Sequence, residues 1–179
     1  MDPQTRKELL AWLPRLRRFA RGLAGNLDDA DDLVQTACER AIRNIDQWQP
    51  GTRLESWMYR IIQTTWIDLV RSRRTREAHA NAVVAMGAHI ANGEGDAVNR
   101  LTLRSVQAAL ERLPDEQRLA VLLVCVEELS YAEAAEVLAV PVGTIMSRLA
   151  RGRLALRRLV EGQRGDPETI QSQGQVNMR

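Results

Sequence analysis

The sequence predicts an all-α protein of two small helical domains joined by a flexible linker, the C-terminal domain being a helix-turn-helix. The chain has 179 residues, of which 45% are hydrophobic and only 4% aromatic. Ala, Leu and Val dominate the hydrophobic set, and this mixture favours helices over a β-sandwich. Helical periodicity weakens in one internal stretch rich in Ala, Asn, Gly and Asp, which is typical of a linker. We therefore expect domains at 1–76 and 98–161, a linker at 77–97 and a disordered tail at 162–179.

Three helices are expected in the N-terminal domain, at about residues 2–23, 28–45 and 54–74. Pro14 should break or kink the first of them, and Gly25 and Asn26 should end it. Asp28 is the expected N-cap of the second helix, where acidic residues complement the helix dipole. Residues 49–51 form a turn before the third helix, which ends in a basic run.

Four helices are expected in the C-terminal domain, at about residues 98–112, 115–128, 131–139 and 143–160. Pro114 should open the second of them in its first turn. The segment from Ser130 to Leu159 has the order of features of a helix-turn-helix. Ser130 and Glu133 form a capping box for a short Ala-rich helix. A Pro- and Gly-containing turn at residues 140–143 follows, and Thr144 is expected to open the last helix.

The last helix has one apolar face and one basic face. At 100° per residue, one side carries Ile145, Leu149, Gly152, Leu156 and Val160. The opposite side and its flanks carry Ser147, Arg151, Leu154, Arg158, Met146, Ala150, Arg153 and Arg157. Recognition helices need short residues near base edges and arginines near phosphates, so the pattern predicts a helix that lies in the major groove of DNA.

Charge and cysteine content narrow the class of protein. The net charge is only +2, and Lys7 is the only lysine beside 24 arginines. Cys38 and Cys125 lie inside apolar helical patterns and are expected to be buried free thiols, as in a reducing cytosol. The sequence shows neither a signal peptide nor a run of 18 apolar residues, so we expect a cytoplasmic protein without a membrane span.

Aromatic residues cluster in the N-terminal domain. Trp48, Trp57, Tyr59 and Trp66 are four of the seven aromatics and fall within 19 residues. They can be core residues, or they can be exposed surfaces for stacking; for Trp57 and Trp66 the core interpretation is at least as good. Polar residues on the same helix are better candidates for contact with a partner: Arg60, Gln63, Thr64 and Arg71.

Several motifs, in order, resemble the extracytoplasmic-function (ECF) subfamily of sigma-70 RNA polymerase sigma factors. The stretch DADDLVQ at 29–35, followed by Arg40, resembles their polymerase-binding helix. WMYRI at 57–61 and the arginine run after Asp68 resemble their promoter-melting helix. Leu113 to Arg118, LSYAE at 129–133 and GTIMSRL at 143–149 resemble their second DNA-binding domain. The resemblance covers roughly residues 8–160.

The resemblance implies a non-enzymatic initiation subunit, without cofactor or metal, with regions 2 and 4 as its two domains. It would bind the clamp and flap of core RNA polymerase, recognise the −35 and −10 promoter elements and promote melting, in a stress or envelope response. An anti-sigma partner is also implied. The residues implied for polymerase binding are Asp29, Asp32, Leu33, Gln35, Thr36 and Arg40. Those for the −10 element are Trp57, Arg60, Gln63, Thr64, Trp66 and Arg71. Those for the −35 element are Thr144, Met146, Ser147, Arg148, Ala150, Arg151 and Arg153.

Some positions depart from the family pattern. Thr36 replaces a usual acid, and Gln63 and Thr64 stand where Arg and Asn are frequent. Met146 replaces a common Lys or Arg, and Ala150 a larger residue. These departures leave the promoter sequence preference open, but they do not affect the predicted fold.

Two other classes of protein fit the sequence less well. A helix-turn-helix repressor or activator usually dimerises on palindromic half-sites, but no dimerisation arm is evident and the acidic helix would have no role. An enzyme is disfavoured because His79 and His89 lie in the linker without a Cys or carboxylate cluster. No nucleophile–base set or Gly-rich phosphate loop is present.

Overall fold

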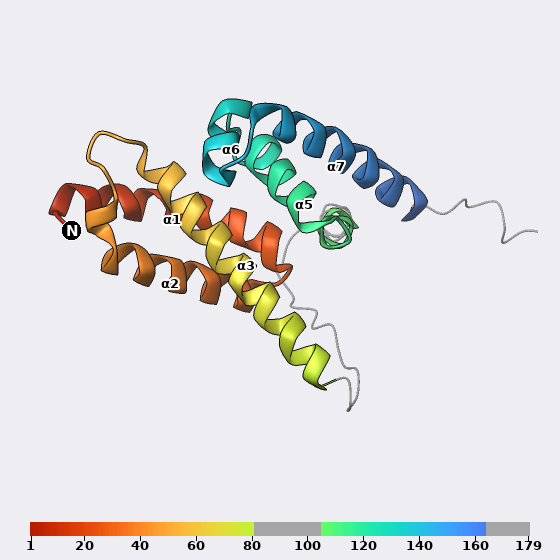
Figure 1. The fold of residues 1–179 in the computed structure, drawn as a ribbon, viewed down its shortest axis with the longest axis horizontal. Coiled ribbons are helices and arrows are strands. Elements are labelled where there is room, and N and C mark those ends of the chain that lie inside the picture. Colours follow the sequence, from red (N-terminus) through yellow and green to blue (C-terminus); the bar gives the residue numbers. More distant parts are fainter. Residues whose placement is uncertain (81–104, 164–179) are drawn as a thin grey trace, which may run out of the picture.

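The computed structural model describes residues 1–80 and 105–163, and within these ranges it is helical and without strands (Figure 1). The all-α prediction with two helical regions is confirmed. The N-terminal unit, residues 1–80, contains α1 (Pro3–Ala24), α2 (Leu27–Arg43), a short 3-10 turn (Ile45–Gln47) and α3 (Leu54–Ala80). The C-terminal unit, residues 105–163, contains a helical stretch at 105–111, α5 (Asp115–Val121), a π-helical turn (Leu122–Val126), α6 (Tyr131–Leu138) and α7 (Val142–Gln163). Of the predicted linker at 77–97, residues 77–80 belong to α3 and the rest lie outside the described residues. Of the predicted tail at 162–179, residues 162–163 belong to α7 and the rest lie outside the described residues.

α1 is a single helix that continues through Pro14, so the proline does not break it. Asp2 caps its start by accepting hydrogen bonds from the backbone amides of Gln4 (2.9 Å) and Thr5 (3.0 Å). Gly25 ends the helix with φ +86°, a left-handed conformation that glycine adopts without steric cost.

The predicted N-cap of α2 is wrong by two residues. Asn26, not Asp28, caps the helix, because its extended backbone lets its side chain accept the amide of Asp29 at 2.8 Å. Asp28 and Asp29 therefore lie in the first turn, where their charge favours the helix dipole. At the other end of the unit, α3 continues past Arg74 to Ala80.

The capping box predicted for α6 is present. The hydroxyl of Ser130 accepts the amide of Glu133 at 3.3 Å, and the Glu133 carboxylate accepts the amide of Ser130 at 2.7 Å. α7 begins at Val142, two residues before Thr144, because the carbonyl of Pro141 accepts the amides of both Thr144 (2.9 Å) and Ile145 (3.3 Å).

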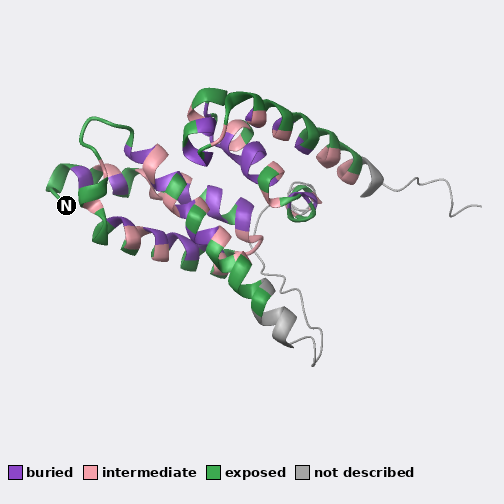
Figure 2. Cartoon of the chain, in the orientation of Figure 1, coloured by how far each residue is buried: buried purple, intermediate pink, exposed green. Residues whose placement is uncertain are grey.

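The hydrophobic core runs through both units, which pack directly against each other (Figure 2). Phe19 and Tyr59 form an edge-to-face pair with ring centroids 5.1 Å apart inside the N-terminal bundle. Leu123 and Ile145 are fully buried in the C-terminal unit. The prediction of two buried thiols is wrong for Cys125, which is exposed because it lies on the outer side of the π-helical turn, whereas Cys38 is half-buried. Neither cysteine forms a disulfide.

Across residues 1–80 and 105–163, none of the helices has the length and apolar character needed to cross a membrane.

Candidate nucleic-acid and polymerase interfaces

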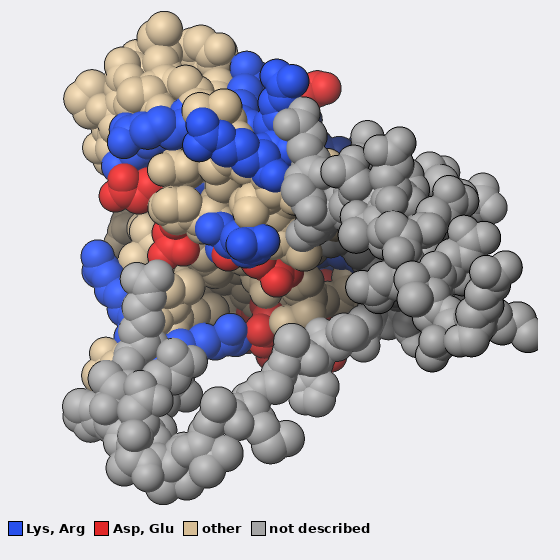
Figure 3. Space-filling view, turned by 90° about the vertical axis from the view of Figure 1, so that its right-hand side faces the viewer, with Lys and Arg blue, Asp and Glu red and all other residues tan. Residues whose placement is uncertain are grey.

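The outer face of α7 is exposed and basic, as predicted. Ser147, Arg151, Leu154 and Arg158 are all exposed, and Lys and Arg side chains gather in a band across the part of the surface where α7 lies (Figure 3). Arg151 donates from Nε to the carbonyl of Ser147 (3.2 Å) and from Nη2 to its hydroxyl (3.3 Å). These bonds lay the guanidinium along the first turns of the helix, where it can meet a phosphate or a base edge.

The inner face of α7 is anchored on α5. Ile145, Leu149 and Gly152 are buried, while Leu156 and Val160 are half-buried. A Cβ on Gly152 would lie 2.8 Å from Cγ2 of Val121, closer than side-chain atoms tolerate. The small residue therefore lets α7 approach α5 closely and fixes the orientation of its basic face.

Two predicted −35 residues lie away from the exposed face. The side chain of Arg148 is only 17% exposed and forms an ion pair with Glu116 at 2.7 Å, which draws it toward α5. Thr144 is half-buried. Arg153 is exposed and donates from Nη2 to the Cys125 sulfur at 3.3 Å.

Apolar side chains stand among the arginines on the outer face. Met146 is 53% exposed and Ala150 is also exposed. Exposed apolar groups at these positions can contact the methyl group of thymine, whereas they contribute nothing to phosphate binding.

The residues predicted for the −10 element are divided between surface and core. Arg60, Thr64 and Arg71 are exposed, Trp57 and Gln63 are half-buried, and Trp66 is only 5% exposed. The hydroxyl of Thr64 donates to the carbonyls of Arg60 and Ile61, both at 3.0 Å.

Trp66 lies beneath Arg118 of the C-terminal unit, whose guanidinium carbon is 5.6 Å from the ring centroid. Burial lowers the pKa of Arg118, but the guanidinium is held by the carbonyls of Leu23 (3.0 Å) and Leu113 (3.4 Å). Trp48 and Tyr59 are also in or against the core. The aromatic cluster is therefore mainly structural in this arrangement of the two units.

α2 presents a short polar stripe. Asp32 and Gln35 are exposed, and Thr36 is half-buried. Leu33, in contrast, is 1% exposed and packs in the bundle, so its side chain does not reach a partner on the surface of α2.

The two charged ends of the set predicted to bind polymerase, Asp29 and Arg40, form ion pairs with α3. Asp29 accepts a hydrogen bond from Arg73 at 2.9 Å, and this bond, followed by that from Asn26, lowers the pKa of the Asp29 carboxyl. Arg40 pairs with Asp68 at 3.1 Å. These pairs hold α2 and α3 in register and leave Asp32 and Gln35 between them.

Sequence reasoning missed the residues that join the two units. Glu127 is buried and accepts hydrogen bonds from Arg15, Arg18 and Tyr59. The one available signal was a carboxylate directly after the apolar run 119–126, a place where burial is common. Burial and the bond to Glu127 both raise the pKa of Tyr59.

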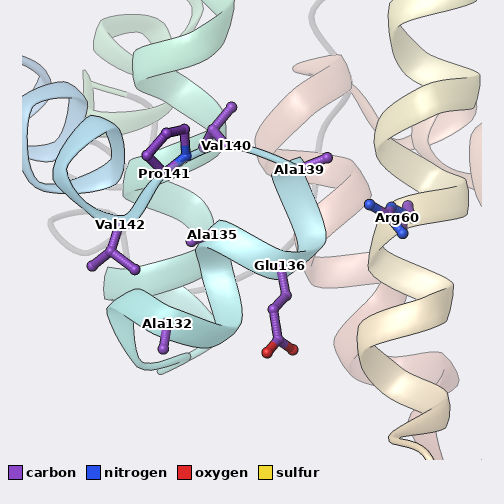
Figure 4. A pocket seen from close by; sticks show the side chains of 8 residues that line it. All are labelled: Arg60, Ala132, Ala135, Glu136, Ala139, Val140, Pro141 and Val142. Atoms are coloured by element: carbon purple, nitrogen blue, oxygen red, sulfur yellow. The ribbon is translucent and has the colours of Figure 1, made fainter.

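An open groove of about 850 Å³ lies between α3 and the turn after α6 (Figure 4). Arg60 borders it from α3, and Glu136, Val140 and Pro141 border it from the helix-turn-helix. The predicted −10 residue Arg60 thus faces the C-terminal unit. Among residues 1–80 and 105–163 no cluster of His, Cys, Asp or Glu could hold a metal ion.

Family models match both units. Residues 9–76 match "Sigma-70 region 2", and residues 103–156 match "Sigma-70, region 4". The chain is 39% identical over 155 residues to the ECF RNA polymerase sigma factor EcfG of Rhodopseudomonas palustris, covering 87% of this chain and 84% of that protein. It is 34% identical over 145 residues to the ECF sigma factor SigW of Bacillus subtilis, covering 76% and 78%. SigE of Mycolicibacterium smegmatis is 41% identical over 145 residues, covering 80% of this chain and 56% of its own length.

Solved structures agree with these matches. The sigma factor RpoE of Bartonella quintana, solved in complex with the anti-sigma factor NepR, superposes with a TM-score of 0.78 at 29% identity, over 89% of this chain and 98% of that one. CnrH, solved in complex with the cytosolic domain of CnrY, superposes with a TM-score of 0.68 at 24% identity over 90% of each chain, which supports the fold.

Proposed function

Because the chain belongs to the ECF subfamily of sigma-70 factors, we propose that it binds core RNA polymerase and directs it to promoters with −35 and −10 elements. It is a non-catalytic initiation factor in this proposal, and its residues supply binding rather than chemistry. The observation that carries the proposal is the presence, in one chain, of a polar stripe on α2 and an exposed basic recognition helix, α7. A DNA-binding module alone would account for α7 and leave the stripe without a role.

α7 would read the −35 element as duplex. Its first turns carry Met146, Ser147 and Ala150 toward base edges, while Arg151 and Arg153 supply charge for phosphates. Arg148 would contribute less, because Glu116 already neutralises it.

α3 would act at the −10 element, where the duplex must open. Unstacking costs a few kcal/mol per step, and exposed arginines and aromatic surfaces can offset that cost. Arg60 and Arg71 are the exposed cations for this role. Trp57, which is half-buried, is the aromatic nearest to solvent among the two tryptophans of this set.

α2 would bind the polymerase clamp through Asp32 and Gln35, with Thr36 at the edge. The C-terminal unit would meet the flap. An anti-sigma protein is the third proposed partner, since the sigma factor RpoE that superposes on this chain was solved with one.

Promoter-dependent transcription with purified core polymerase tests the proposal. We expect the chain to co-purify with core polymerase and to start transcription at discrete sites on genomic fragments. Failure to co-purify, together with tight binding to duplex DNA by the free chain, would instead indicate a repressor or activator.

Asp32→Ala sharpens this test. The carboxylate is exposed, so the variant should keep its helicity and lose affinity for core polymerase. Asp31→Ala is the matched control, because Asp31 is an exposed neighbour paired with Arg17 at 3.4 Å. Equal loss in both variants would argue against a specific stripe at Asp32.

A further inference from the structure

Glu127 is a buried carboxylate of the C-terminal unit that accepts hydrogen bonds from side chains of the N-terminal unit. Its side chain has no exposed surface. Arg15 donates to it at 3.3 Å, Arg18 at 2.9 and 3.0 Å, and the Tyr59 hydroxyl at 2.6 Å. A charge buried in this way is strongly destabilising once its partners are removed. The carboxylate therefore makes the closed arrangement depend on a few named groups.

The same two arginines also bind the backbone of the C-terminal unit. Arg15 donates to the carbonyl of Glu127 at 2.7 Å, and Arg18 to that of Val126 at 3.1 Å. These carbonyls belong to the end of the π-helical turn, where the chain leaves regular helix. The arginines thus satisfy acceptors that helical bonding leaves open.

The contact continues on both sides of Glu127. A Cβ on Gly22 of α1 would lie 2.5 Å from a methyl group of Leu122, so the missing side chain lets the units approach. Arg118 binds the Leu23 carbonyl at the end of α1 and covers Trp66 of α3. Arg53, at the start of α3, forms an ion pair with Glu133 of the α6 capping box.

This closed arrangement does not fit a promoter. The −35 and −10 elements lie about 25 base pairs apart, which is roughly 80 Å of B-DNA at 3.4 Å per base pair. Here α3 is bonded directly to the first turn of the helix-turn-helix through Arg53 and Glu133. Trp66 and Arg60, both predicted to act at the −10 element, face the C-terminal unit.

We propose that Glu127, with Arg15, Arg18 and Tyr59, is an interdomain latch that keeps the free chain closed, with Arg118 of the C-terminal unit over Trp66 of the −10 helix. The latch must open before one chain can contact both promoter elements. This inference rests on the proposed function for its consequence, but the latch itself is a property of the free chain. α7 stays exposed in the closed state, so the latch controls the −10 surface rather than the −35 surface.

The test is the distance between the two units in the full-length free chain. Spin labels are placed at Lys7 and Ala150, both exposed, after Cys38 and Cys125 are replaced by Ser. We expect a single narrow distance distribution in this parent chain. In the Arg15→Ala/Arg18→Ala variant we expect a longer, broader distribution, because removing the partners of a buried charge shifts the closed-to-open ratio by about 100-fold or more.

Arg17→Ala is the matched control, since Arg17 lies on the same helix and pairs only weakly with Asp31 at 3.4 Å, both side chains being well exposed. It should leave the distance unchanged. Gly22→Leu is a second variant that separates opening from unfolding. Leucine favours α1 as a helix. A Cβ at position 22 already meets the methyl groups of Leu122 across the interface, so the larger side chain should open the chain without loss of helicity.

Binding of a −10 single strand by the free chain is the functional readout, and it should rise in both opening variants relative to Arg17→Ala. A broad distance distribution in the parent chain, or an unchanged distribution in both variants, overturns the latch. Core-polymerase binding is measured on the same proteins. A parent chain that opens on substitution but never binds polymerase supports the latch and rejects the proposed function.

Discussion

The two helices proposed to read DNA, α3 and α7, differ in how their surfaces are made. α7 presents its basic face to solvent and buries the opposite face on α5 within its own unit. α3 is buried on one side by α1 and α2, and part of its remaining surface is covered by the other unit. The proposed −35 surface is therefore complete within the C-terminal unit, whereas the exposure of the proposed −10 surface depends on where that unit lies.

This difference explains why the exposure of Arg151 on α7 could be predicted from the sequence, whereas the burial of Trp66 on α3 could not. Arg151 on α7 stays exposed whatever the neighbouring unit does, because its hydrogen bonds are to Ser147 on its own helix. Trp66 on α3 is buried in the hydrophobic core, and the guanidinium of Arg118 from the other unit lies over its ring. We therefore expect Trp66→Ala on α3 to change mainly the stability of the fold, and Arg151→Ala on α7 to change mainly the affinity for DNA.

Trp66→Ala has the largest expected effect. Loss of a buried tryptophan should lower the free energy of unfolding by about 3–5 kcal/mol, as measured by urea denaturation. Thr64→Ala, on the exposed side of the same helix, is the control and should change stability by less than about 0.5 kcal/mol. A Trp66→Ala chain as stable as the wild type would show that the ring is not part of the core in solution.

Arg151→Ala should weaken binding to a −35 duplex by about 1–3 kcal/mol with little change in stability. If Arg151 meets a phosphate, the dependence of affinity on salt should fall by about one unit of slope. Arg148→Ala is the matched control on the same helix, because Arg148 is largely buried against Glu116. An equal loss of salt dependence in both variants would contradict the division of α7 into an outer and a flanking face.

Met146→Arg should alter which −35 sequence is preferred, by about 1 kcal/mol between single base-pair variants. Met146 is exposed, so stability should stay within about 0.5 kcal/mol of the wild type. Competition binding with duplexes that differ at one position measures the preference. Leu10→Arg, at an exposed apolar position on α1, controls for added charge, and a preference that shifts equally there would remove Met146 from the reading face.

Asp29→Asn has the smallest expected effect and probes how α3 is held on α2. Hydrogen bonds from Arg73 and Asn26 lower the pKa of Asp29 below its ordinary value of 3.8. The folded state thus favours the charged carboxylate, and its stabilisation is present at neutral pH and is lost as the pH falls below 4. We expect the variant to be less stable than wild type by under about 1 kcal/mol at pH 7, with the difference shrinking on acidification. A difference that does not shrink as the pH is lowered would assign it to packing instead of charge.

Local features were predictable because each depends on residues close together in the chain. The Ser130–Glu133 capping box, the turn before α7 and the exposed and buried faces of α7 follow from spacing and side-chain type. The errors are also local: Asn26 competes with Asp28 for the cap and succeeds because Gly25 turns the chain just before it. The motif order likewise predicted the family that the comparisons show.

The placement of Leu33 and Trp66 required the tertiary structure. Leu33 lies within a motif implied for polymerase binding, but its side chain points into the bundle and not toward a partner. Trp66 has the chemistry of a stacking platform, but it is buried in the core, and Arg118, 52 residues later in the chain, lies over its ring.

By itself, then, the sequence determined the helices, the two units and the basic face of α7, because helical periodicity and capping act over three or four residues. Only the tertiary structure decided that Glu127 is buried between Arg15, Arg18 and Tyr59. Those partners lie far from it in sequence, and a buried charge is tolerated only where such distant groups converge on it.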